Sequence, residues 1–327
     1  MMTTDTQLLP EEPLDVLGTR LAEDGAVSEF LYTGASGLWR LRLRDGGWED
    51  PALVAREPGY DGYRNYPPVW NGRYLAFRHE DDSLCVVPLD GRAPITIDDR
   101  EGGLCFLPDG ERLLVVDGEE ARIHDLREPG GSVCHIDAFH KFKFPYYDDV
   151  DDPGWLSFVK DRTGGHHLAA GCYGYFACWP VRLGADGLPE PAGPPVTLVD
   201  PFAYDHVRIC AVGPAGAVWV NDVSGNGLVR FEAETGEHAE APVGRNSEHA
   251  ICHGVLPSPE SAAAWVRTKD KAAIWRPDGG WLSLPDQAIS AVAFRGNALW
   301  CTVLGGEMLS RLDVSGLPPP AKAPNRR

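Results

Sequence analysis

Positive charge is scarce in this chain of 327 residues, where 30 Lys and Arg stand against 48 Asp and Glu and the formal net charge is −18. A surface this acidic lacks the clustered cations that hold nucleic-acid phosphates, and anionic lipid headgroups repel it. We therefore expect neither a nucleic-acid partner nor membrane binding.

Long apolar runs are also missing. No stretch approaches the roughly 20 apolar residues that cross a bilayer, and residues 1–13 lack the basic start and apolar core of a secretory signal. With 37 Gly and 28 Pro, few windows are long enough for a helix bundle or coiled coil. These absences predict a cytoplasmic protein built from short elements.

Several chemical motifs are absent as well. None of the eight cysteines forms a C-x-x-C pair, and the chain has no G-x-S-x-G elbow and no phosphate-binding loop. Most cysteines lie in apolar strand-like runs, such as Ser-Leu-Cys-Val-Val at 83–87. This pattern predicts buried free thiols, with a disulfide framework as the alternative.

What the sequence does contain is a repeat of about 40 to 45 residues with four short strand patterns in each unit. The clearest unit covers 216–237, and further copies start near 261 and 297. Asp-Gly pairs at 45–46, 109–110 and 278–279 supply turns between the strands. This period and strand count predict an all-β fold, a single β-propeller.

Counting the units predicts seven four-stranded blades, with six or eight as alternatives, near residues 26–58, 63–97, 101–138, 140–200, 204–243, 247–285 and 288–315. The fourth unit is long, which predicts an insertion within 166–195, with His166 and His167 in an exposed turn. The predicted domain limits are a flexible N-terminus at 1–12, the propeller at 13–316 and a disordered Pro-rich tail at 317–327. The stretch 13–26 is expected to supply the strand that closes the ring.

Two segments carry a family resemblance. Residues 108–113 (Pro-Asp-Gly-Glu-Arg-Leu) resemble the turn of TolB-like and WD-repeat propellers. The segment from Trp219 to Gly236 resembles the W-x-x-D…L-x-R-x-D-x-x-T-G unit of NHL and virginiamycin-B-lyase-like propellers, although Glu232 stands where that unit has Asp. The resemblance covers most of the chain as a repeat pattern, and it implies the fold without choosing a function.

Candidate functional residues gather in the loops that lead into the innermost strands, which propeller closure brings to one end of the channel. These loops repeat Tyr, His and carboxylates, a set suited to proton transfer near neutral pH. The candidate catalytic residues are Tyr66, Tyr146, Asp205, His206, Glu248 and His249. The candidate substrate-binding residues, which include the second-to-third strand loops, are Tyr63, Arg64, Arg78, Asn221 and Arg267.

Two functions follow from these candidates. The first is an enzyme of the lyase, cyclase, isomerase or hydrolase type that acts on a small molecule. The second is a non-catalytic scaffold that binds a protein partner, for which loop aromatics and a negative rim would favour a basic partner. The cofactor prediction is none or a divalent metal, with His140, His206 and His249 as the candidate ligands. The tryptophans at 39, 219, 265, 275 and 300 are predicted to pack between blades.

Overall fold

The computed structural model describes most of the chain as short stretches of strand and turn. The described residues are 2–11, 15–21, 28–44, 47–56, 68–79, 83–99, 102–117, 120–127, 133–135, 142, 155–172, 174–199, 207–213, 216–222, 227–241, 252–258, 263–268, 272–277, 280–284, 290–295, 298–302 and 308–314.

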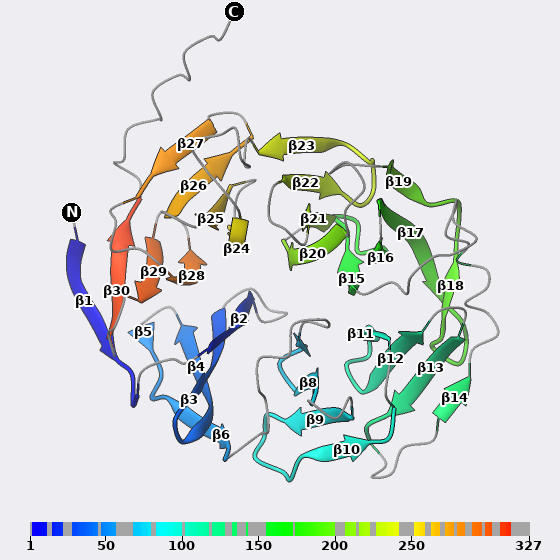
Figure 1. The fold of residues 1–327 in the computed structure, drawn as a ribbon, viewed down its shortest axis with the longest axis horizontal. Coiled ribbons are helices and arrows are strands. Elements are labelled where there is room, and N and C mark those ends of the chain that lie inside the picture. The colour runs from blue at the N-terminus through cyan, green and yellow to red at the C-terminus, as the bar shows by residue number, and fades with distance from the viewer. Residues whose placement is uncertain are drawn as a thin grey trace, which may run out of the picture.

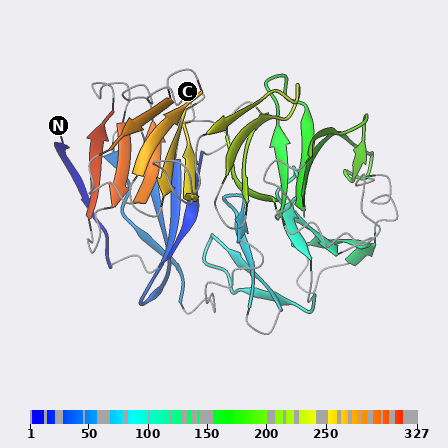
Figure 2. The ribbon, with the colours of Figure 1, turned by 45° about the horizontal axis from the view of Figure 1, so that its top comes forward.

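In the described part of the chain the strands form seven antiparallel sheets set radially around a central axis (Figures 1 and 2). Blade 1 contains β2 (Asp15–Leu21), β3 (Ser28–Gly34), β4 (Gly37–Arg44), β5 (Gly47–Trp48) and β6 (Ala52–Ala55). Blade 2 contains β7 (Val69–Trp70), β8 (Tyr74–Arg78), β9 (Leu84–Pro88) and β10 (Ile95–Ile97). Blade 3 contains β11 (Gly103–Phe106), β12 (Arg112–Asp117), β13 (Glu120–Asp125) and β14 (Val133–His135).

Blades 4 to 7 follow in the same order, except that the last blade takes its fourth strand from the start of the chain. Their strands are β15 (Trp155–Lys160), β16 (His166–Cys172), β17 (Tyr175–Leu183), β18 (Pro189–Pro191) and β19 (Val196–Val199); β20 (Val207–Val212), β21 (Ala217–Asp222), β22 (Leu228–Glu232) and β23 (His238–Ala241); β24 (Cys252–Pro257), β25 (Ala264–Thr268), β26 (Ala272–Arg276) and β27 (Gly280–Ser283); and β28 (Ser290–Arg295), β29 (Ala298–Thr302), β30 (Met308–Asp313) and β1 (Met2–Leu8). The predicted propeller with seven blades is confirmed.

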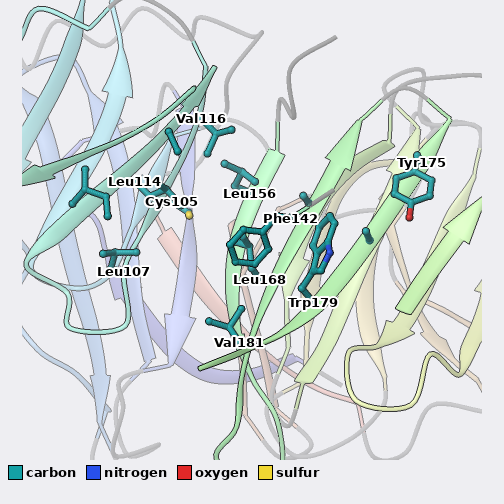
Figure 3. Packing of buried hydrophobic residues seen from close by; sticks show 14 residues of the cluster. Cys105, Leu107, Leu114, Val116, Phe142, Leu156, Leu168, Tyr175, Trp179 and Val181 are labelled. Atoms are coloured by element: carbon teal, nitrogen blue, oxygen red, sulfur yellow. The ribbon is translucent and has the colours of Figure 1, made fainter. Parts of the chain in front are cut away.

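The core lies between neighbouring blades because each sheet has two faces and must bury both. Figure 3 shows one such layer, where Leu114 and Val116 of blade 3 face Leu168 and Trp179 of blade 4. Between blades 5 and 6, the Trp219 and Trp275 rings meet edge to face with their centroids 5.3 Å apart.

The predicted core tryptophans are confirmed at four of five positions, since Trp219, Trp265, Trp275 and Trp300 are buried. The fifth, Trp39, is partly buried and packs against the layer between blades 7 and 1.

The cysteines that the structure describes with their side chains are free thiols, and four of the five are buried: Cys85, Cys105, Cys178 and Cys301. Burial raises the pKa of Cys85 and of Cys301 to about 11 and that of Cys178 to about 12. These thiols are therefore protonated and act as small apolar groups in the core.

The N-terminal segment closes the ring. Strand β1 pairs antiparallel with β30, so the first strand of the chain completes the last blade (Figure 1). Leu9 then packs among Phe30, Tyr32 and Trp300, which belong to blades 1 and 7. Beyond it, the Glu11 carboxylate accepts hydrogen bonds from the backbone and hydroxyl of Ser36 in blade 1.

The closing strand differs from the one that the sequence predicts. It is Met2–Leu8, within the segment assigned to a flexible N-terminus, and not 13–26. Asp15–Leu21 instead forms the innermost strand of blade 1. The reason for the error is physical: an outermost strand faces solvent on one side, so Met-Thr-Thr-Asp-Thr-Gln-Leu shows no apolar alternation.

Blade 4 has an unusual outer edge and a polar hairpin. The nine-residue β17 pairs with β18 along one half and with β19 along the other. The prediction of an exposed turn at His166 and His167 is wrong, because both residues lie in β16 and His167 is buried. Its Nε2 lies 2.9 Å from Oδ2 of Asp161, whose Oδ1 accepts from the Thr163 and Gly165 backbone.

Within the residues that the structure describes, no helix is long and apolar enough to span a membrane.

Deleting residues 2–8 tests the closure. The shortened chain leaves β30 as an open edge, and we expect its Tm to fall by about 5–10 °C, equivalent to a few kcal/mol. A synthetic peptide of residues 1–9, added in excess, should restore part of the loss by mass action. Calorimetry measures both effects, with a peptide of scrambled sequence as the control. An unchanged Tm after the deletion would show that the ring closes without β1.

Candidate functional site

Most of the predicted site residues lie outside the described part of the chain. This applies to all six candidate catalytic residues, which are Tyr66, Tyr146, Asp205, His206, Glu248 and His249. It also applies to the substrate-binding candidates Tyr63 and Arg64 and to the candidate metal ligand His140. Their roles stay predictions. Among the residues that are described, no group of three His, Cys, Asp or Glu side chains could hold a metal ion.

The three remaining candidates do share one end of the propeller. In an antiparallel four-stranded blade, the second-to-third turn and the loop into the next blade lie at the same end, here called the mouth. Arg78, Asn221 and Arg267 are at or near the ends of the second strands of blades 2, 5 and 6, so all three lie at the mouth. Substrate binding by these residues stays a prediction.

Arg78 is fully buried and belongs to an ionic network between blades 2 and 3. Its guanidinium donates to the backbone carbonyls of Asp99 and Gly102 and lies 3.7 Å from the Asp99 carboxylate. The same carboxylate accepts two hydrogen bonds of 2.9 Å from Arg122 and lies 2.8 Å from His124 Nε2. A substrate could reach Arg78 only if this network opened.

Asp99 stays ionised within this network. Burial by itself raises the pKa of Asp99, but hydrogen bonds from His124 and Arg122 outweigh burial and hold that pKa well below its usual value. The carboxylate thus pairs with two guanidinium groups in a largely buried junction, which joins the second and third blades at the mouth.

Asn221 is also fully buried, and it orients an arginine of the innermost strand. Its Oδ1 accepts a hydrogen bond of 3.1 Å from Nε of Arg208, the residue opposite it on β20. In the described part of the chain, the Asn221 amide nitrogen has no acceptor and Arg208 has no carboxylate partner. Arg267, half-buried on β25, likewise has no ion-pair partner among the described residues.

A cavity of about 560 Å³ lies at the opposite end of the propeller, among blades 1, 2 and 3. This end, here called the turn face, contains the first-to-second and third-to-fourth turns of each blade. We name the cavity the arginine pocket, because five of its ten lining residues are arginines: Arg40, Arg42, Arg73, Arg92 and Arg127, with Gly72, Tyr74, Leu89, Asp90 and Glu111.

Two arginines of the pocket come from blade 1 and share one buried carboxylate. Arg40 and Arg42 alternate along β4, and both pair with Glu29 on the neighbouring β3. Arg40 also reaches blade 2, where it donates to the carbonyls of Gly72 at 3.0 Å and Leu89 at 3.3 Å. This side chain therefore fixes the spacing between the first two blades at the back of the pocket.

The other three arginines stand on turns and are largely exposed, with 58–64% of each side chain accessible. Arg92 and Arg127 follow the third strands of blades 2 and 3 and are held alike. Each donates its backbone N–H and its Nε to the aspartate two positions earlier, Asp90 or Asp125. Arg73, in the first turn of blade 2, pairs with Glu111 of blade 3.

The two aspartates that hold Arg92 and Arg127 are themselves kept ionised. Hydrogen bonds from the Arg92 backbone and side chain lower the pKa of Asp90, and a hydrogen bond from Arg127 lowers that of Asp125. The guanidinium groups of Arg92 and Arg127, here called forks, are thus held in fixed orientations at neutral pH.

An aromatic residue also lines the pocket. The Tyr74 ring stacks on Phe106 of blade 3, and the Arg92 guanidinium lies 5.8 Å from the Tyr74 ring centroid. The Tyr74 hydroxyl accepts a hydrogen bond from Arg92 and donates one to Glu111, and both are 3.3 Å long. Because Tyr74 is itself buried, its hydroxyl serves to position Arg92 and Glu111 at the pocket.

The arginine pocket lies at the end of the propeller opposite the loops in which the sequence-based candidates are found. A usable signal was present, since aligning the repeat units brings Asp90-Gly91-Arg92 onto Asp125-Leu126-Arg127 at the same strand end. The pairs that cross blades, such as Arg73 with Glu111, have no local signal.

Solved structures of other proteins are similar to this one over nearly their whole length. The β-propeller domain of Cps50 (Swd1) from Myceliophteria thermophila is 12% identical with a TM-score of 0.58, covering 95% of this chain and 100% of that one. A chain of the mitotic checkpoint complex is 14% identical with a TM-score of 0.53, covering 96% and 99%. The fold is that of a β-propeller.

A chain of hydrazine synthase from Kuenenia stuttgartiensis is also similar, at 12% identity and a TM-score of 0.51, covering 96% of this chain and 98% of that one. No protein-family model and no curated protein sequence matches the chain. Since one similar structure is named as an enzyme and another as part of a checkpoint complex, the β-propeller fold does not choose between catalysis and docking.

Asp99→Asn tests the network that holds Arg78. Removing the charge takes away the carboxylate that Arg78 and Arg122 share in a buried junction, and we expect a loss of about 3–5 kcal/mol of unfolding free energy at pH 7. Because the pKa of Asp99 is lowered in the folded state, its contribution is present above the unfolded pKa of about 4 and is lost as pH falls further.

Urea unfolding of both proteins between pH 7 and pH 3 measures this effect. The difference between wild type and variant should shrink below about pH 4. Glu190→Gln, which breaks an exposed pair with Arg182, is the control and should cost less than about 1 kcal/mol. A difference that stays constant with pH would contradict the role of the Asp99 charge.

Proposed function

We propose that this protein is a non-catalytic β-propeller that docks a protein partner, with the arginine pocket as part of the docking surface. The observation that carries the proposal is the convergence of five arginines from three blades on one cavity in a chain of net charge −18. Arginines that are already paired and fixed are typical of recognition surfaces, because less side-chain entropy is lost when they bind.

The dimensions of the pocket support docking of a small part of a partner. A volume of about 560 Å³ accommodates one or a few side chains, and it is open at the turn face, where loops of blades 2 and 3 form its rim. Arg and Tyr, which both line it, are enriched among residues that dominate binding energy at protein interfaces.

The charge pattern refines the kind of partner. Outside the pocket the chain is acidic, so a basic or neutral partner surface is favoured at long range. Inside the pocket the sign is reversed, and screening limits the influence of distant charges to about 8–10 Å. The partner therefore presents an anionic group within an otherwise neutral or basic surface.

A second candidate function, an enzyme acting on a small molecule at the mouth, is favoured by the Arg208–Asn221 pair. Arg208 is a half-buried cation on an innermost strand, and within the described residues it is held by Asn221 alone. Such a group suits the carboxylate or phosphate of a small substrate. The proton-transfer roles of His206, His249 and the other catalytic candidates belong to this hypothesis.

Docking through the arginine pocket predicts a defined loss in Arg73→Gln combined with Arg127→Gln. Both side chains are exposed, so the fold should keep its Tm within a few degrees, while capture of the partner should fall at least about tenfold. Quantitative affinity capture compares wild type, the double variant and Arg182→Gln, a matched exposed arginine of blade 4. Equal capture by all three proteins would overturn the proposal.

The enzyme hypothesis predicts a bound small anion or metal ion at the mouth. Native mass spectrometry and metal analysis of protein purified without chelator should detect it, and Arg208→Ala or His206→Ala should remove it. A species retained by both variants would contradict a site built from these residues.

A further inference from the structure

We propose that the arginine pocket recognises a phosphoryl group on a side chain of the partner. The inference rests on the proposed docking function and names the chemistry that the pocket selects.

Counted over the residues that the structure describes, the pocket has a surplus of one positive charge. Its five arginines are held by four carboxylates, which are Glu29, Asp90, Glu111 and Asp125. The neighbouring Asp109 and Arg112 pair with each other and cancel. An anion therefore enters a site whose cations are largely compensated, and it must compete with the carboxylates already there.

Several guanidinium N–H groups remain for such an anion. Arg92 and Arg127 each engage Nε and one terminal nitrogen, and neither uses Nη1 for a partner among the described residues. Within the described part of the chain, Arg42 engages only its Nε, with Glu29, and Arg73 engages only Nη1, with Glu111. These four forks are the donors offered at the rim of the pocket.

A partner carboxylate has little to gain here. It carries the same single charge as the carboxylates that already hold the arginines. Replacing one of those carboxylates would therefore substitute one ion pair for an equivalent one. A phosphoryl monoester carries between about −1.5 and −2 charges near pH 7 and has three acceptor oxygens. It can accept from more than one fork while the internal pairs stay in place.

The electrostatic field of the acidic chain favours one compact anion over an extended one. A long acidic segment or a nucleic acid would extend beyond the pocket and meet the surface of a chain with net charge −18. A single phosphoryl group places its charge within the screening distance of the arginines and leaves the flanking partner residues free to be neutral or basic.

Three small probes test the charge and the oxygen geometry separately. Phenyl phosphate has three acceptor oxygens and close to two charges, phenyl sulfate has three oxygens and one charge, and benzoate is a carboxylate. We expect calorimetric titration at physiological salt and neutral pH to give a Kd for phenyl phosphate at least about tenfold below those for the other two probes. Arg73→Gln with Arg127→Gln should lose that binding, and Arg182→Gln should retain it.

Each other result overturns the inference. Equal binding of the three probes, or no phenyl phosphate binding up to about 10 mM, excludes phosphoryl selectivity. Binding that survives the double variant excludes this pocket as the site. Partner capture that depends on the pocket but survives phosphatase treatment would also overturn it and leave the docking function intact, whereas pocket-independent capture overturns the docking function itself.

Discussion

The antiparallel pairing of β1 with β30 is the interaction on which the rest of the molecule depends. Each blade buries its faces only against its two neighbours, so an open ring would expose one face of blade 1 and one of blade 7. The pairing uses backbone hydrogen bonds, and Leu9 and Glu11 extend it into the core and the second turn of blade 1. One short polar strand thereby sets the position of the first blade, and with it the wall of the arginine pocket that Arg40 and Arg42 form.

Stability and recognition use the same kind of contact at the two ends of blade 2. At the mouth, Asp99 joins Arg78 of blade 2 to Arg122 of blade 3 in a dry network. At the turn face, Arg40 links blade 1 to blade 2 through backbone carbonyls, and Arg73 links blade 2 to blade 3 through Glu111. The first network is buried and closed, whereas the second leaves guanidinium groups in solvent. Burial thus separates an ionic contact that serves packing from one that is available to a partner.

The features that could be predicted from the sequence are those that depend on local periodicity. The repeat of strand and turn, the Asp109-Gly110 turn with its positive-φ glycine, and the buried Trp219 and Trp265 are each encoded within one unit. The closing strand was not predicted because Met2–Leu8 is an edge strand whose sequence has no apolar alternation. The pocket was missed because most of its contacts cross blades, as in Arg40 with Gly72 or Arg73 with Glu111, and such pairs depend on the ring being closed.

Self-pairing of the arginines has a consequence for specificity. A cluster of bare guanidinium groups would attract every anion and would destabilise the fold through repulsion of like charges. Glu29, Asp90, Glu111 and Asp125 remove most of that charge and fix the direction of each fork. Under the proposed docking function, affinity for singly charged anions falls as a result, while an anion with two charges and several oxygens can use the N–H groups that the internal pairs leave over. The acidic residues of the pocket would then act with its arginines, because they would set how much charge a ligand must carry to bind.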